Sequence, residues 1–96
     1  MIVFQEKIRG KQTQKETRLS ITIKKRIADE HNLKSGDFVK VRLEDCAKVP
    51  RFNVEFRKRI AKAGSEGTMI YLPKKIVVEN ELRLGMYVLV KLEEFY

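Results

Sequence analysis

Apolar and polar residues alternate in six short stretches of the chain, the spacing typical of half-buried β-strands. These stretches are residues 2–8, 19–23, 38–43, 54–60, 70–72 and 87–92. Their order repeats along the chain, because the stretches at 2–8 and 54–60 match at an offset of 52 positions. The pattern therefore predicts a mainly β protein that contains two related units.

A longer alignment confirms that the sequence contains an internal repeat. Residues 19–43 align without a gap on residues 68–92, at a constant offset of 49 positions. Eight aligned pairs are identical: Lys25/Lys74, Ile27/Ile76, Glu30/Glu79, Leu33/Leu82, Gly36/Gly85, Val39/Val88, Val41/Val90 and Leu43/Leu92. A repeat decides architecture before any other signal. Two copies of so short a unit predict a dimer-like fold within one polypeptide.

Each repeat also predicts one short helix. The helices are expected at residues 24–32 and 73–81, anchored on the core by Ile27 and Ile76. Pro73 suits the first turn of the second helix. Because two helical turns are marginal in isolation, both helices must be held by packing.

Glycine and polar residues predict the turns. The polar segment 10–17 is expected to form a hairpin loop between two strands, and the shorter segment 62–67 is its counterpart. Gly36 and Gly85 occupy the same place in the two repeats, which indicates a backbone with positive φ.

Chain length favours one domain, residues 1–96, made of a first half at 1–45 and a second half at 50–96. Neither half is long enough to bury an adequate core alone, so we expect a shared core. No apolar run approaches the roughly 20 residues that cross a bilayer, and the N-terminus does not resemble a signal peptide. A single cysteine, Cys46, fits a reducing compartment. We therefore expect a cytoplasmic protein without membrane association.

The charge is unevenly distributed along the chain. The formal net charge is +8, and residues 7–26 hold eight basic side chains against one acidic side chain. Residues 48–62 hold six basic side chains against one acidic one. Two basic clusters at related places in a repeat predict a polyanion-binding face.

The order of these features resembles the AbrB/SpoVT/MazE swapped-hairpin family, and the likeness covers nearly the whole chain. The second copy carries the family pattern at Ile70, Leu72, Pro73, Lys74, Ile76, Leu82, Gly85 and Val88. The first copy carries it at Ile21, Ile23, Lys25, Ile27, Leu33, Lys34, Gly36, Asp37 and Val39.

The resemblance implies a swapped-hairpin β-barrel with two short helices, built as an intrachain pseudo-dimer. It also implies a transcriptional regulator that binds double-stranded DNA on the nucleoid and exists as a monomeric pseudo-dimer or weak homodimer. Together with the basic clusters, it gives nine candidate DNA contacts: Lys7, Arg9, Lys11, Lys15, Arg18, Arg57, Lys58, Arg59 and Lys62. Strand alternation predicts that Arg57 and Arg59 share one face, whereas Lys58 points with the core-facing residues.

The chain departs from the family pattern at several positions. A family arginine before the second strand's apolar triplet is Ser20 in one copy and Met69 in the other. The helix arginine is replaced by Ala28 and Val77, and the glycine before the last leucine by Asn32 and Glu81. These differences leave the expected fold unchanged but weaken any residue-by-residue transfer of DNA contacts.

Other functions remain open at this level. A protein-interaction module, such as an antitoxin or an assembly adaptor, is the main alternative, although a toxin-wrapping segment is not expected because the sequence stops right after the last strand. RNA binding is a third hypothesis, weakened because most aromatic residues are expected in the core. No residue spacing fits a catalytic triad or a zinc site, so we expect neither an enzyme, a metal nor a cofactor.

Overall fold

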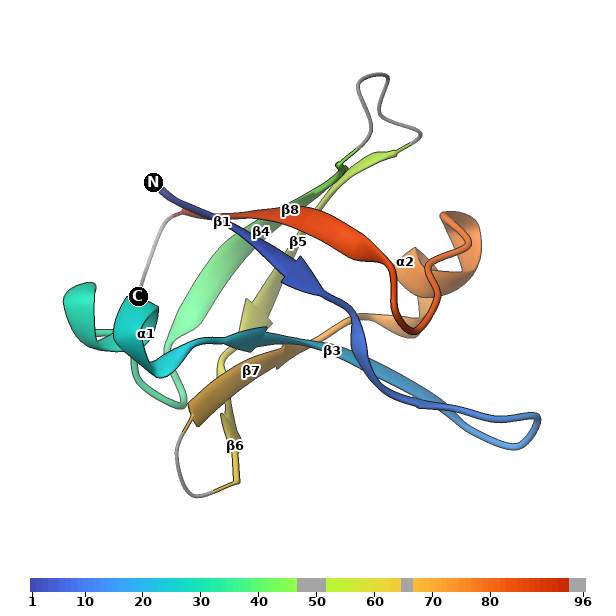
Figure 1. The fold of residues 1–96 in the computed structure, drawn as a ribbon, viewed down its shortest axis with the longest axis horizontal. Helices are drawn as coiled ribbons and strands as arrows, with labels where there is room; N and C mark the ends of the chain where they lie inside the picture. The colour runs from blue at the N-terminus through green and yellow to red at the C-terminus, as the bar shows by residue number, and fades with distance from the viewer. Residues whose placement is uncertain (47–51, 65–66, 94–96) are drawn as a thin grey trace.

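The computed structural model describes residues 1–46, 52–64 and 67–93. Within these ranges the protein is mainly β, with two four-stranded antiparallel sheets and two short helices (Figure 1). The first sheet has the order β1 (Ile2–Lys7), β8 (Tyr87–Glu93), β4 (Phe38–Asp45), β5 (Asn53–Arg59). The second sheet has the order β2 (Arg9–Gln12), β3 (Thr17–Ile23), β7 (Gly67–Tyr71), β6 (Ala61–Ala63).

The two repeats exchange strands in the first sheet. Strand β1 of the first repeat pairs with β8 of the second, and Ile2 lies opposite Leu92. Strand β5 of the second repeat pairs with β4 of the first, and Val54 lies opposite Leu43. The two pairs are equivalent, because the offset of 52 relates Ile2 to Val54 and the offset of 49 relates Leu43 to Leu92. The register therefore relates the two halves by a pseudo-two-fold axis, which passes between β4 and β8.

The same axis relates the halves of the second sheet, where Ile21 lies opposite its own equivalent, Ile70. The expected closed barrel is not found, because no ladder among the described residues joins the two sheets into one. The chain passes from the first sheet to the second at Ile8 and Ile60. There it leaves the ladders and hydrogen-bonds to a turn of the other repeat, as Ile8 N does to Met86 O at 2.8 Å.

The hydrophobic core formed by the described residues draws on both repeats. Alternate residues of the central strands point inward and are fully buried, and Val41 and Val90 are 0% exposed. Inward residues of β3 and β7, including Ile21 and Ile70, join the same cluster. The two sheets therefore pack their inner faces on one another, as a sheet with one apolar face requires.

The helices are shorter than predicted. Helix α1 spans Lys25–Glu30 and α2 spans Lys74–Glu79, on opposite sides of the molecule (Figure 1). The predicted anchors were partly wrong, because Ala28 and Val77 are the buried helix residues. The two isoleucines named for that role are only half-buried against the core.

Both helices end in the same way. Asn32 and Glu81 have positive φ, and Leu33 N and Leu82 N donate to the carbonyls of the buried helix residues five positions earlier. This is the Schellman arrangement, which satisfies the last carbonyls of a helix. Neither helix in the described part of the chain has the length and apolar character needed to cross a membrane.

The predicted glycine turns are confirmed. Gly36 has φ of 97° and Gly85 has φ of 93°. The equivalent turns hold the sheet crossings in place, because Gly36 N donates to Ile60 O and Gly85 N donates to Ile8 O.

Candidate nucleic-acid interface

A two-stranded basic ribbon formed by β2 and β3 extends away from the body of the molecule (Figure 1). Arg9 lies opposite Ser20, and Lys11 lies opposite Arg18. Residues directly opposite one another share a face of the sheet. Because Leu19 points into the core from the other face, Arg9, Lys11 and Arg18 all lie on the outer face of the second sheet, where their side chains are exposed.

The ribbon ends in a turn closed by Thr13 and Glu16. Thr13 N donates to Glu16 O at 2.7 Å, and Glu16 N donates to Thr13 Oγ1 at 3.0 Å. Lys15 is exposed within this turn, and Lys11 Nζ lies 3.7 Å from Glu16 Oε2. Such an exposed ion pair contributes little to stability. Lys11 can therefore leave Glu16 and pair with another anion that binds it more tightly.

Gly10 allows the two strands of the ribbon to approach closely. Its φ is 124°, and a Cβ atom placed there would lie 2.1 Å from the carbonyl oxygen of Arg18. Any other residue would meet both a strained backbone and a neighbour that cannot move away. The display of Arg9 and Lys11 on the ribbon therefore depends on glycine between them.

The fold brings a basic residue of the second repeat next to this ribbon. Arg18 and Lys58 line the same hollow, of about 460 Å³, together with Tyr71. The Arg18 guanidinium lies 5.4 Å from the centroid of the Tyr71 ring, a cation–π contact that holds it against the sheet. Lys58 is half-buried, whereas its neighbours Arg57 and Arg59 are exposed, so the predicted alternation along this strand is confirmed.

Lys7 lies on the other side of the ribbon's base. It lines a hollow of about 500 Å³ with Arg9, Leu84 and Gly85. Five of the nine predicted contacts, Lys7, Arg9, Lys11, Lys15 and Arg18, therefore belong to one continuous segment of the structure, and Lys58 lies beside it.

The structure places Arg57 and Arg59 elsewhere, on the outer face of the first sheet. Arg59 donates from Nη1 to Gly36 O at 3.0 Å, and its guanidinium lies 5.5 Å from the Phe38 ring centroid. Arg57 lies opposite Lys40 in the neighbouring strand. Lys62, the last predicted contact, is exposed on β6 at the far edge of the second sheet.

The surroundings of Arg57 are balanced in charge. Lys40 Nζ and Arg42 Nη2 lie 3.4 Å and 3.1 Å from Glu55 Oε1, and Lys91 Nζ lies 2.6 Å from Glu44 Oε2. The hydrogen bond from Arg42, supported by the charge of Lys40, lowers the pKa of the Glu55 carboxyl. The same hydrogen bond raises the pKa of Arg42. Cations on this face therefore have acidic neighbours, unlike most of those on the basic ribbon.

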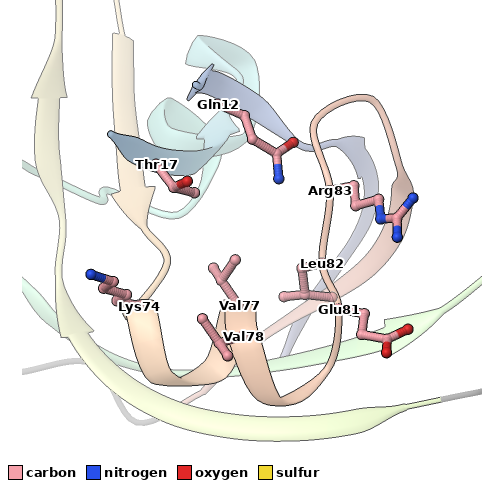
Figure 2. A pocket seen from close by; sticks show the side chains of 8 residues that line it. All are labelled: Gln12, Thr17, Lys74, Val77, Val78, Glu81, Leu82 and Arg83. Atoms are coloured by element: carbon pink, nitrogen blue, oxygen red, sulfur yellow. The ribbon is translucent and has the colours of Figure 1, made fainter. Parts of the chain in front are cut away.

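A hollow beside α2 was not predicted from the sequence. Val77, Val78 and Leu82 provide its apolar surface, and the Gln12 side chain reaches toward it from the basic ribbon (Figure 2). Its volume is about 290 Å³, and Lys74 and Arg83 stand on opposite sides of it. Gln12 Oε1 accepts a hydrogen bond from Leu84 N at 3.1 Å, which ties the ribbon to the turn after α2.

One sequence signal points to this hollow. Val78 is 67% exposed, although the equivalent position in the first repeat is Asp29. An exposed valine at a position that is acidic in the other copy indicates that the two helices have diverged on their solvent-facing sides.

Groups suited to metal or thiol chemistry are sparse. Among residues 1–46, 52–64 and 67–93, no three His, Cys, Asp or Glu side chains lie together in a way that would hold a metal ion. Although Cys46 is exposed, desolvation by neighbouring atoms and the nearby charge of Asp45 raise the pKa of its thiol and so disfavour the reactive thiolate. His31 caps the C-terminal end of α1 and is exposed.

Comparisons with known proteins support the fold alone. No protein-family profile matches the chain, and no curated protein matches it. A solved structure described as the solution structure of PHS018 from Pyrococcus horikoshii matches with a TM-score of 0.73 at 18% sequence identity. The match covers 98% of this chain and 90% of that protein. The arrangement of strands and helices described above is therefore shared with a protein of low sequence identity.

Proposed function

We propose that this protein binds double-stranded DNA through the basic ribbon and regulates transcription. The observation that carries the proposal is the row of Arg9, Lys11 and Arg18 on one exposed face of a two-stranded ribbon. The major groove of B-DNA accommodates a two-stranded β-ribbon, and arginine can donate two hydrogen bonds to a guanine edge. A ribbon of this shape and charge therefore suits duplex DNA.

The cations around the ribbon divide into two roles under this proposal. Arg9 and Arg18 face outward from adjacent strands and would reach base edges. Lys15 in the turn, together with Lys7 and Lys58 at the base of the ribbon, would contact phosphates on either side of the groove. Phosphate contacts fix the position of a protein on DNA, and base contacts supply specificity.

The finer description of the fold belongs to the same proposal. The exchange of β1 and β5 between repeats supports an AbrB-like swapped-hairpin arrangement written into a single chain. Each chain would then act as a complete pseudo-dimer. On DNA in a prokaryotic cell, such a protein would work on the nucleoid.

A salt titration of binding tests the proposal. Fluorescence anisotropy with duplex fragments should show an affinity that falls steeply as salt rises, because bound cations are released from the DNA. Replacing Arg9, Lys11 and Arg18 together by alanine should weaken binding by about tenfold or more, since each arginine contact with a base edge is worth about 1–3 kcal/mol.

A variant that loses the same charge elsewhere provides the control. Lys25, Lys34 and Lys75 are exposed on or beside the helices, and their triple alanine variant should keep most of the affinity. If both triple variants lose affinity equally, net charge rather than the ribbon governs binding, and the proposal fails. The absence of any binding at low salt would also refute it.

A protein-interaction module is the second candidate, favoured by the apolar hollow beside α2. Val78, which lines this hollow, is 67% exposed. Native mass spectrometry of the purified protein, compared with a Val78→Asp variant, tests this candidate. A stoichiometric partner that the variant loses, with DNA affinity unchanged, would support interaction as the primary function.

A further inference from the structure

The two ends of the second sheet are equivalent in backbone and opposite in surface chemistry. In the basic ribbon Arg9 lies opposite Ser20, and in the β6–β7 ribbon Ala61 lies opposite Met69. The repeat offset of 52 relates Arg9 to Ala61, and the offset of 49 relates Ser20 to Met69, so the two pairs are equivalent. The two ribbons therefore present the same positions on the same outer face.

The cations of the basic ribbon are absent at the equivalent positions. Ala61, Ala63 and Gly67 replace Arg9, Lys11 and Arg18 in turn, and Ala63 lies opposite Gly67 as Lys11 lies opposite Arg18. The β6–β7 ribbon does carry Lys62. That residue lies opposite Thr68, so it belongs to the other face of the sheet.

The contacts that support the basic ribbon are missing at the second end as well. The equivalent of Tyr71, whose ring holds the Arg18 guanidinium, is Thr22. The equivalent of Lys58 is Glu6, which is only 6% exposed. A lysine beside one ribbon is therefore matched by a buried carboxylate at the other, and a carboxylate would repel a phosphate.

We infer that the chain binds duplex DNA with one end of the second sheet only, so that each molecule holds one duplex, in one orientation, at a site without two-fold symmetry. This inference rests on the proposed function. Symmetric dimers recognise palindromic sites, because their two equal surfaces read two equal half-sites. A pseudo-dimer with a single basic ribbon has one reading surface, and it therefore imposes a direction on the DNA it binds.

Counting bound duplexes tests the inference. Native mass spectrometry of the full chain with an excess of a 12-base-pair duplex should show one duplex per chain at saturation. The Arg9→Ala, Lys11→Ala, Arg18→Ala variant should bind none under the same conditions.

The outcomes separate the inference from the function on which it rests. If the unmodified chain binds no duplex at low salt, the proposed function fails and the inference falls with it. If the chain binds two duplexes, or the triple alanine variant still binds one, DNA binding stands and the one-ended mode is overturned. Circular dichroism establishes that the triple alanine variant is folded.

Discussion

Asn32 and Glu81 hold the backbone in the left-handed region directly after each helix, with φ of 53° and 52°. This conformation costs an ordinary L-residue roughly 1–2 kcal/mol, whereas glycine adopts it freely and asparagine tolerates it. We predict that Glu81→Gly raises the free energy of unfolding by about 1 kcal/mol, measured by urea denaturation. Asn32→Gly should raise it by less. An equal gain at both positions, or a loss at Glu81, would contradict this explanation.

Glu55 makes the stability of the fold sensitive to acid. The Arg42 hydrogen bond and the Lys40 charge favour its carboxylate, so the pKa is lower in the folded state than in the unfolded chain. Its contribution is therefore complete above the unfolded pKa, about 4.3, and is lost as the pH falls through the folded value. We predict that acidification from pH 6 to pH 3 destabilises the unmodified protein more than Glu55→Gln, measured by urea denaturation at each pH.

The Arg42→Met background provides the control for this pH effect. Because the hydrogen bond from Arg42 is the largest cause of the lowered pKa, Glu55→Gln should change the acid sensitivity much less in that background. An unchanged difference would assign the effect to another group.

At the scale of the structural elements, the basic ribbon formed by β2 and β3 depends strongly on the backbone at Gly10. A Cβ at Gly10 would collide with the Arg18 carbonyl at 2.1 Å, whereas a Cβ at Gly64 meets nothing within 4 Å. We predict that Gly10→Ala destabilises the protein by about 1–3 kcal/mol and weakens DNA binding, because the ribbon must move apart. Gly64→Ala, also at positive φ, should cost less and leave binding intact. Thermal melts and anisotropy measure the two effects; equal losses would show that φ alone is responsible.

The periodicity of the sequence predicted six of the eight strands that the structure describes, because alternation reports directly on which residues face a core. It missed β2 and β6, which fall mostly in the segments 10–17 and 62–67 that were predicted as loops. Ile2 and Val54, Val41 and Val90 all behave as that rule requires. The helices were less accurate because the face that a short helix buries is decided by tertiary packing. The structure buries Ala28 and Val77 rather than the larger isoleucines beside them, and nothing in the local spacing distinguishes the two choices.

The candidate interface was predictable only in part, for a similar reason. Charge clustering identified Arg9, Lys11 and Arg18, which the structure brings onto one face. It could not separate them from Arg59, whose guanidinium is held by the Gly36 carbonyl from a distant turn. Contacts between segments far apart in the chain depend on how the strands are connected and paired. The number of charges in a stretch of sequence gives no information about that arrangement.

At the scale of the whole molecule, the fold depends on which strands pair and not on the order in which the two repeats follow one another along the chain. Ile2 lies opposite Leu92, so a short linker of roughly five residues would join residue 93 to residue 1. We predict that a circular permutant that begins at Phe52 and ends at Cys46 adopts the same fold, with a free energy of unfolding within about 1 kcal/mol of the parent.

Circular dichroism and urea denaturation measure this outcome. The permutant keeps every strand pair described above, so its spectrum should overlay that of the parent. If the permutant fails to fold, the original connection between β4 and β5 stabilises the fold by more than merely joining the two strands.

The exchange of strands also has a consequence for synthesis on the ribosome. Of the strands that the structure describes, β1 is made first and its partner β8 is made last. Ile2 and Phe4 therefore lie on a strand that has no native ladder partner until β8 has emerged. Pairings between distant segments form slowly and leave apolar surface exposed meanwhile. The first sheet therefore cannot be completed until β8 has left the ribosome.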